Sequence, residues 1–338
     1  EETVQEFKQA LKKYDLQDAF TVYEISEGVK MVLKEKIYFS EGGIKIVDTN
    51  NKIISKVIEM LRDNSYAVYV KGYAAKNEKE VIVQIELQAR FDEASNMEYA
   101  QKMQDEGIKL IFGVKGLKVH SKVCLVERLE NKKIKLYGFI STGNFNNATA
   151  KIYTDYTLFT ANQQILKDLN KVFNFLKTNY IVNKYKHLLV SPHYAKNGFL
   201  KLIDIEIAKA KNGQPAQIKL KLNSITSYKM VDKLYEASNA GVQIKMIIRG
   251  ICCLIPGVEG LSENIEAISI VDKYLEHPRM LIFGVEGEEK VFISSSDWMT
   301  RHPVNIVEVT CPIYDEDINK ELIAPFSICC KDKVKARI

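Results

Sequence analysis

Two spacings of apolar residues alternate along the chain. A spacing of three and four, typical of amphipathic helices, marks residues 2–14, 53–62, 92–107, 163–177, 199–210 and 228–239. Short apolar runs rich in β-branched residues, typical of strands, mark 22–33, 36–47, 66–70, 81–89, 110–114, 119–126, 136–140, 217–222, 242–249 and 291–298. Alternation of this kind predicts an α/β fold in which helices flank mixed sheets.

The same elements recur in the same order in the second part of the chain. VQIELQAR, which ends at Arg90, resembles VQIKMIIR, which ends at Arg249, so the two arginines are 159 residues apart. A histidine with a cation two positions on occurs as His120-x-Lys122 and again 157 residues later as His277-x-Arg279. Two features at nearly one offset predict an internal duplication, because chance rarely repeats a spacing.

The repeated histidines are candidate site residues. Residues two apart on a strand point to the same face, so each histidine shares a face with a cation. Strand, charged turn and strand then lead to a small polar cluster, STGNFN at 141–146 and SSSDW at 294–298. Small residues let a backbone approach an anion closely. A lone histidine on an apolar strand is usually a core residue, and only the second copy favours a functional role.

These motifs resemble the phospholipase D superfamily and, within it, the C-terminal half of bacterial polyphosphate kinase. The resemblance rests on ELQARFDE, VHSKVCLVER, STGNFNNATAKIYTDYTLFTA, IIRGICCLIPGVEGLSENIEAISIVDKYLEH, SSSDWM and KVKARI, and it covers the chain from about residue 51 to the end. It implies two phospholipase D-like domains, each a mixed sheet flanked by helices, over 51–180 and 188–338. Residues 1–50 carry no family motif and are expected to be an N-terminal remnant.

The resemblance also implies an activity. It is the reversible transfer of the γ-phosphate of ATP to inorganic polyphosphate through a phosphohistidine, with Mg²⁺ required. His120 falls on the phosphorylated histidine of the family, and a neutral imidazole is a competent nucleophile near pH 7. His277 is then expected to move a proton or contact phosphate. Lys122 and Arg279 are expected to stabilise charge in the transition state.

Further site residues follow from the same resemblance. Arg90 and Arg249 are expected to clamp phosphate oxygens, and Arg90 lies at the position that the family associates with Mg²⁺, where an arginine acts only indirectly. Tyr153 falls on the tyrosine that stacks on adenine, although a strand tyrosine is more often a core residue. Asn144 is a candidate phosphate ligand. Like Asn146 and Ser296, it either supports the site or forms a turn.

The chain departs from the family pattern in two places. Ile306 stands where a phosphate-binding arginine is expected, and Arg301 or His302 is the candidate to compensate. The first half also has too few residues after Tyr73 for the helix that joins parallel strands in the second half. A segment near Tyr73 and Ala74 is therefore expected to be missing.

Composition adds few constraints. The 338 residues are 46% hydrophobic and carry a formal net charge of +5, a mild excess that fits a polyanion partner without requiring one. No apolar run is long enough to span a membrane and no signal peptide opens the sequence, so a cytoplasmic location is expected, with peripheral membrane contact left open. ATP, ADP and polyphosphate are the expected partners, without nucleic acid, and a homo-oligomer is expected from the family. The six cysteines lack zinc-site spacing and are expected to be reduced and mostly buried.

Two other functions stay open from the residues alone. A phosphodiesterase of the phospholipase D kind would use the same histidines on a diester. An inactive polyanion-binding module would use the cations without turnover, and Ile306 favours this third interpretation.

Overall fold

The fold is taken from a computed structural model, which describes residues 2–25, 28–33, 56, 81–86, 93–114, 116–178, 183–300, 306–332 and 335–337. Contacts divide the chain into two units, residues 1–78 and 79–338. The elements expected over 36–47, 53–62 and 66–70 lie outside the described residues. So do Tyr73, Ala74, Arg90, Arg301 and His302.

The first unit contains an amphipathic helix and a hairpin. Helix α1 (Glu2–Lys13) buries Ala10 and Leu11 against Leu16. Strands β1 (Phe20–Ile25) and β2 (Gly28–Leu33) pair antiparallel. The single strand expected over 22–33 is therefore wrong, because the Ser-Glu-Gly sequence at 26–28 interrupts the apolar run with turn-forming residues.

In the second unit, the residues before about 180 form two small sheets. Strands β3 (Ile82–Ile85) and β4 (Lys109–Phe112) are parallel, and α3 (Glu93–Asp105) lies between them in sequence. Strands β6 (Lys122–Glu130), β7 (Lys133–Ser141) and β9 (Thr157–Thr160) form an antiparallel sheet. Asn131 and Lys132 turn β6 into β7 with φ of 49° and 63°, as a two-residue hairpin requires. Helix α5 (Gln163–Thr178) packs on this sheet through Leu166 and Leu169.

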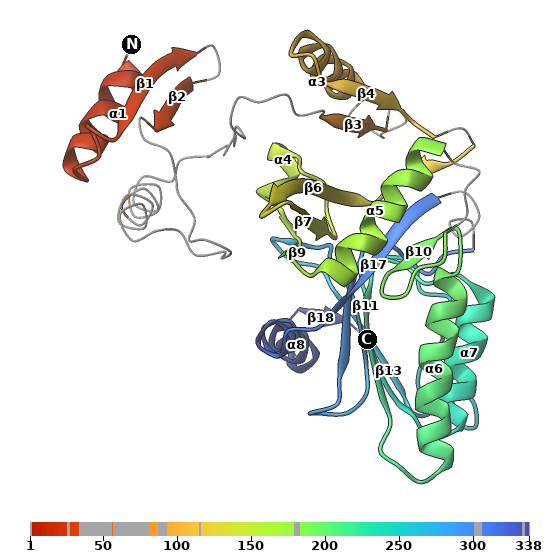
Figure 1. Ribbon diagram of the computed structural model, residues 1–338. Helices are drawn as coiled ribbons and strands as arrows, with labels where there is room; N and C mark the ends of the chain where they lie inside the picture. The colour runs from red at the N-terminus through yellow and green to blue at the C-terminus, as the bar shows by residue number, and fades with distance from the viewer. Residues whose placement is uncertain are drawn as a thin grey trace. The chain divides into compact units, whose positions relative to one another are not determined.

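The second half forms a larger mixed sheet, shown in Figure 1. Its strands run in the order β10 (Leu189–Ser191), β17 (Ile306–Ile313), β16 (Lys290–Ser294), β15 (Arg279–Phe283), β11 (Gln217–Leu222), β12 (Gln243–Ile248), β13 (Ile265–Ile270) and β18 (Ala336–Arg337). Only β11, β12 and β13 are parallel to one another along this path. The mixed α/β architecture expected from the sequence is thus confirmed.

Helices cover both faces of the larger sheet. Helices α6 (Ala195–Lys211) and α7 (Tyr228–Asn239) pack on the face that carries Leu220 and Leu281. Helix α8 (Glu316–Lys331) packs on the opposite face, which carries Met280 and Ile282 and which α5 also contacts. The predicted bounds of α7 and β11 match the structure, whereas α6 begins at residue 195 rather than 199.

Two short parallel pairings join the halves. Strand β5 (Lys118–Val119) pairs with the start of β17, and β8 (Tyr153–Thr154) pairs with β14 (Leu275–Glu276). Near them α4 (Asn147–Ala150) forms one helical turn. The sequence places His120 on a strand over 119–126, and this is wrong. Each of the two histidines lies at a junction, between β5 and β6 or between β14 and β15, because the chain changes its pairing partner there.

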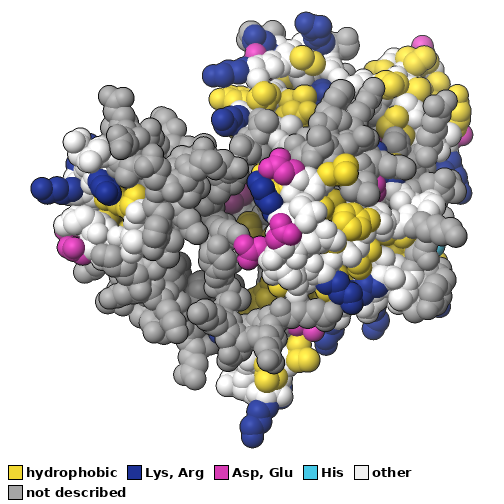
Figure 2. Space-filling view, turned by 90° about the horizontal axis from the view of Figure 1, so that it is seen from above, with side chains coloured by type: hydrophobic (Ala, Val, Ile, Leu, Met, Phe, Trp, Pro, Cys, Tyr) yellow, Lys and Arg dark blue, Asp and Glu magenta, His cyan; other side chains and the backbone are white. Residues whose placement is uncertain are grey.

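In its described part, the surface shows no concentration of one charge on the face drawn in Figure 2. On the face shown in Figure 2, the Lys and Arg side chains of the described residues are dispersed among Asp and Glu rather than gathered. None of the helices in the described ranges is long and apolar enough to cross a membrane. All six thiols are free, but Cys252 and Cys253 are exposed and only Cys311 is buried, so the expectation of mostly buried cysteines is wrong.

Candidate active site

His120 is held by a carboxylate that lies 188 residues further along the chain. Its Nδ1 lies 3.0 Å from Oε1 of Glu308 on β17. The backbone N–H groups of His120 and Ser121 both donate to the carbonyl of Val307, which fixes the junction. In a neutral ring, a carboxylate beside Nδ1 favours the tautomer with the proton on Nδ1, which leaves the lone pair of Nε2 free. Nε2 has no hydrogen-bond partner among the described residues, and the side chain is 35% exposed.

His277 also contacts a carboxylate from a distant part of the chain, but its side chain is more buried than that of His120. Its Nδ1 lies 2.8 Å from Oδ1 of Asp155, and its side chain is only 14% exposed. On the other side Nη1 of Arg279 donates to Nε2 across 2.8 Å, so Nε2 is unprotonated and its lone pair is occupied. Burial lowers the pKa of His277, with the charges of Arg279 and Lys122 adding to the effect against the opposing pull of Asp155. A neutral ring with a blocked Nε2 results.

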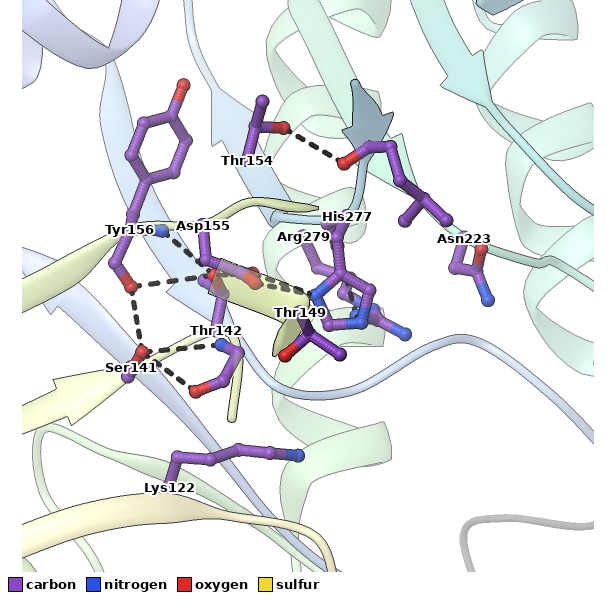
Figure 3. A network of polar contacts seen from close by, with 12 residues as sticks. Lys122, Ser141, Thr142, Thr149, Thr154, Asp155, Tyr156, Asn223, His277 and Arg279 are labelled. Atoms are coloured by element: carbon purple, nitrogen blue, oxygen red, sulfur yellow. Dashed lines mark hydrogen bonds and ion pairs between the residues drawn. The ribbon is translucent and has the colours of Figure 1, made fainter. Parts of the chain in front are cut away.

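The two histidine sites share one hydrogen-bond frame. Asp155 Oδ1 accepts from the hydroxyl of Thr142 across 2.6 Å, and Glu308 Oε2 accepts from the hydroxyl of Ser295 across 2.6 Å. The residue after each carboxylate donates its backbone N–H to the same hydroxyl. Figure 3 shows the first of these frames, with Asp155 between Thr142 and His277. Each imidazole is therefore oriented only when both halves are in place.

Lys122 lies close to both histidine sites. Its ammonium donates to the carbonyl of His120, and Figure 3 shows it extending past Thr142 toward the side where His277 lies. Burial lowers the pKa of Lys122 to about 8; the charge of Arg279 adds to this shift, whereas the charges of Glu308 and Asp155 oppose it. These charges come from both halves of the repeat. No carboxylate of a described residue forms an ion pair with Lys122.

Arg279, in contrast, is neutralised. Nη2 donates to Oδ2 of Asp297 across 2.8 Å, and both side chains are almost fully buried. Asp297 also accepts from the backbone N–H groups of Asn223 and Ser224, and these contacts hold its pKa below the usual range although burial opposes the shift. Asn223 follows β11 directly, and its side-chain Oδ1 is buried without a partner.

Arg249 and Tyr153 lie at the edge of the same site. Burial and the charge of Arg279 lower the pKa of Arg249, while Tyr153 and Asp297 oppose the shift, which places all of them within electrostatic reach. Nε of Arg249 is buried without a hydrogen-bond partner. The ring of Tyr153 lies 4.9 Å from that of His277 between centroids. The structure therefore brings Tyr153, Arg249 and Arg279 together around His277.

Other residues singled out from the sequence are not placed in this way. Asn144 is exposed in the turn after β7. Asn146 accepts the N–H of Thr149 and so begins α4, which is a structural role. Ile306 is nearly buried where β17 begins, in register with Lys118. Arg90 lies outside the described residues.

Sequence reasoning missed the carboxylates. Asp155 and Glu308 were not candidates, because each contacts a histidine 122 or 188 residues away. A signal does exist: Asp155-x-Thr157 and Glu308-x-Thr310 occupy equivalent places, and each threonine hydroxyl contacts Ser141 or Ser294. The repeat, extended by these pairs, would have found them.

The side chains of this site do not form a metal centre. The described residues contain no group of three His, Cys, Asp or Glu side chains able to hold an ion. Asp155, Glu308 and Asp297 are each already engaged by a histidine or an arginine. Mg²⁺ typically binds one or two carboxylates together with substrate phosphates. The donor set of the described residues therefore does not fit a cation held by the protein alone.

Comparison with known proteins gives consistent matches over both halves. The family model described as polyphosphate kinase C-terminal domain 1 matches residues 46–182, and that described as C-terminal domain 2 matches residues 188–338. The polyphosphate kinase of Vibrio cholerae is 47% identical over 78% of this chain and 38% of the relative, and that of Escherichia coli is 44% identical over the same shares. The crystal structure of polyphosphate kinase from Porphyromonas gingivalis matches with a TM-score of 0.68 and 36% identity over 85% of this chain and 45% of that one. The chain spans about two-fifths of the length of these curated relatives.

Proposed function

The chain belongs to the polyphosphate kinase family, and on this premise we propose that it transfers the γ-phosphate of ATP to inorganic polyphosphate, reversibly, through a phosphohistidine at His120. The observation that carries the proposal is the difference between the two imidazoles. Nε2 of His120 is unblocked and partly exposed, whereas Nε2 of His277 is occupied by Arg279. Only the first can attack a phosphorus atom without a rearrangement.

In the first step, Nε2 of His120 forms a bond to the γ-phosphorus while the bond to the β,γ-bridging oxygen breaks, which releases ADP. Glu308 keeps the proton on Nδ1 and stabilises the positive charge that develops on the ring. Lys122, whose ammonium forms no ion pair with a described carboxylate, is proposed to stabilise the charge on the equatorial oxygens. The terminal phosphate oxygen of polyphosphate then attacks the same phosphorus and frees His120.

Residues from both halves are proposed to hold the nucleotide. Arg249 offers an unpartnered Nε to phosphate oxygens, and Tyr153 offers a ring face to adenine. Asn144, exposed beside the site, is proposed as a further phosphate ligand, and Arg90 as a second clamp. Mg²⁺ is proposed to enter with ATP, held by its phosphates.

The same frame supports an internal duplication. Lys122 pairs with Ser141 across β6 and β7, and Arg279 pairs with Ser294 across β15 and β16. We infer two phospholipase D-like domains over 51–180 and 188–338, after an N-terminal remnant over 1–50. A cytoplasmic location and a homo-oligomeric state are inferred from the family, and peripheral membrane contact is left open.

The test is labelling with γ-labelled ATP. Wild type should acquire acid-labile, alkali-stable label and elongate polyphosphate, and His120→Ala should do neither. His277→Ala should still be labelled, with turnover lowered about 10²- to 10⁴-fold. Label on His120→Ala would contradict the proposal. Cleavage of a phosphodiester without labelling would support the phospholipase D alternative, and polyphosphate binding without turnover in wild type would support the binding module.

A further inference from the structure

A buried ion pair lies next to His277, and the proposed reaction does not use it. The ammonium of Lys221, near the end of β11, donates to Oε2 of Glu276 on β14. The side chain of Lys221 is 5% exposed and that of Glu276 is 21% exposed. Glu276 directly precedes His277, so the pair connects the larger sheet to the residue that carries the second imidazole.

The surroundings of this ion pair are mostly apolar. Lys221 is in register with Met280 of β15, which belongs to the core on the face that α5 and α8 contact. Tyr156 packs against the same core, and burial raises its pKa, with the charge of Glu276 adding to the shift. Removing two charges from water costs free energy that their attraction only partly offsets, so a buried ion pair contributes little net stability. The location of the pair therefore favours a role in positioning over a role in stability.

The segment that leads into His277 has little backbone support of its own. Strand β14 pairs with β8 over only two residues on each strand. His277 and Asp155 follow directly, so the contact between them lies one residue beyond the paired segment. Figure 3 shows this contact together with the hydrogen bond from Thr154 to the carbonyl of Leu275. Because so short a pairing opens easily, a side-chain contact from the larger sheet can decide where the imidazole lies.

We propose that Lys221 is a positioning residue, which holds Glu276 and thereby keeps His277 against Asp155. Among the described residues, the ammonium of Lys221 forms a hydrogen bond only to Glu276, so its effect on the imidazole passes through that residue. The consequence for turnover rests on the proposed function. The consequence for the orientation of the imidazole rests on the contacts alone.

The chain offers a matched control on the same strand. Lys219 lies two residues before Lys221, so both side chains point to the same face of β11. Nζ of Lys219 lies 3.7 Å from Oε1 of Glu289, and these side chains are 13% and 10% exposed. Glu289 belongs to the turn between β15 and β16, so Lys219→Met removes a comparable ion pair that does not adjoin a histidine.

The first measurement is NMR of the protein with isotope-labelled histidine, in which His277→Ala identifies the signal of His277. Wild type should show the tautomer with the proton on Nδ1, which faces Asp155. Lys221→Met should shift the ring nitrogen signals toward a mixture of tautomers, and Lys219→Met should leave them unchanged. Glu276→Gln, which keeps the shape of the side chain but removes its charge, should act like Lys221→Met.

The second measurement is turnover. Lys221→Met should lower kcat for polyphosphate synthesis about tenfold, within the range for a misplaced catalytic group. In a His277→Ala background the same substitution should lower kcat no further, because the ring that Lys221 positions is then absent. Lys219→Met should leave kcat unchanged in both backgrounds.

The outcomes separate this inference from the catalytic proposal. Wild-type signals of His277 in Lys221→Met would overturn the positioning role, and Glu276→Gln decides the question if Lys221→Met does not fold. A further fall in kcat when Lys221→Met is added to His277→Ala would show a general structural role instead. Absence of phosphohistidine labelling in wild type would contradict the proposed function, and the NMR signals of His277 would still test the role of Lys221.

Discussion

The two histidine sites share a frame and differ in charge. Each pairs Nδ1 with a carboxylate from the opposite half, and each carboxylate accepts from a hydroxyl at the end of a strand. In the second half Asp297 neutralises Arg279, which occupies Nε2 of His277. In the first half the equivalent place holds Asn144, so Lys122 stays without a carboxylate. A single acidic side chain thus distinguishes a cation that is neutralised, Arg279, from one that forms no ion pair with a described carboxylate, Lys122.

The largest effect should follow from removing the carboxylate behind the nucleophile. Glu308→Gln leaves the shape of the side chain but no longer fixes the proton on Nδ1 of His120, and kcat should fall about 10³-fold. Asp155→Asn should lower kcat by only about 10²-fold, because Arg279 still holds His277. Steady-state polyphosphate synthesis measures both. An equal fall in kcat for the two variants would show that the two histidines contribute equally to turnover.

A smaller effect is expected at the position where the hydrogen-bond frame around Asp155 has a glycine and the frame around Glu308 has a serine. Gly143 has no Cβ, and an added Cβ would overlap the carboxylate of Asp155, whereas its equivalent Ser296 has one. Gly143→Ala should displace Asp155 from His277 and lower kcat about 30-fold, within the range for a misplaced catalytic group. Ser296→Gly serves as the control and should change kcat little. A Gly143→Ala enzyme with normal kcat would mean that Asp155 can move without consequence.

The pH dependence should separate Lys122 from Arg279. The pKa of Lys122 is lowered to about 8, so its ammonium loses its proton as pH rises through that value. At pH 9 kcat/KM should therefore be about tenfold below its plateau. Lys122→Arg keeps its charge to far higher pH and should remove this alkaline decline. If the decline persists in Lys122→Arg, another group causes it.

The smallest effect should come from copying the second half into the first. Asn144→Asp places a carboxylate where Asp297 stands in the other site. Since the position is exposed, its attraction for Lys122 is worth at most about 1 kcal/mol, and the KM for polyphosphate should rise about threefold. Asn144→Ser removes the amide without adding a charge, so it measures the part of the effect that comes from the lost phosphate ligand alone. A lower KM in Asn144→Asp would mean that Lys122 does not face the polyanion.

The sequence predicted what local patterns encode. The periodicity of the apolar residues predicts α7 and β11 to the residue, and the repeated His-x-cation pairs predict both imidazoles and both cations of the site. The carboxylates escaped notice because their partners lie in the opposite half, and an apolar strand context such as that of Glu308 is typical of a core. His120 was expected on a strand because its neighbours are apolar, and such neighbours cannot reveal that the chain changes its pairing partner at this residue.

The crossed arrangement of the carboxylates also bears on how the activity can be divided. A fragment ending at residue 178 would contain His120 without Glu308, and one beginning at residue 183 would contain His277 without Asp155. Neither fragment could orient its own imidazole. Turnover by a mixture of the two fragments would therefore measure how far they bind to each other again. Each histidine is therefore oriented only after both parts of the chain have folded against each other.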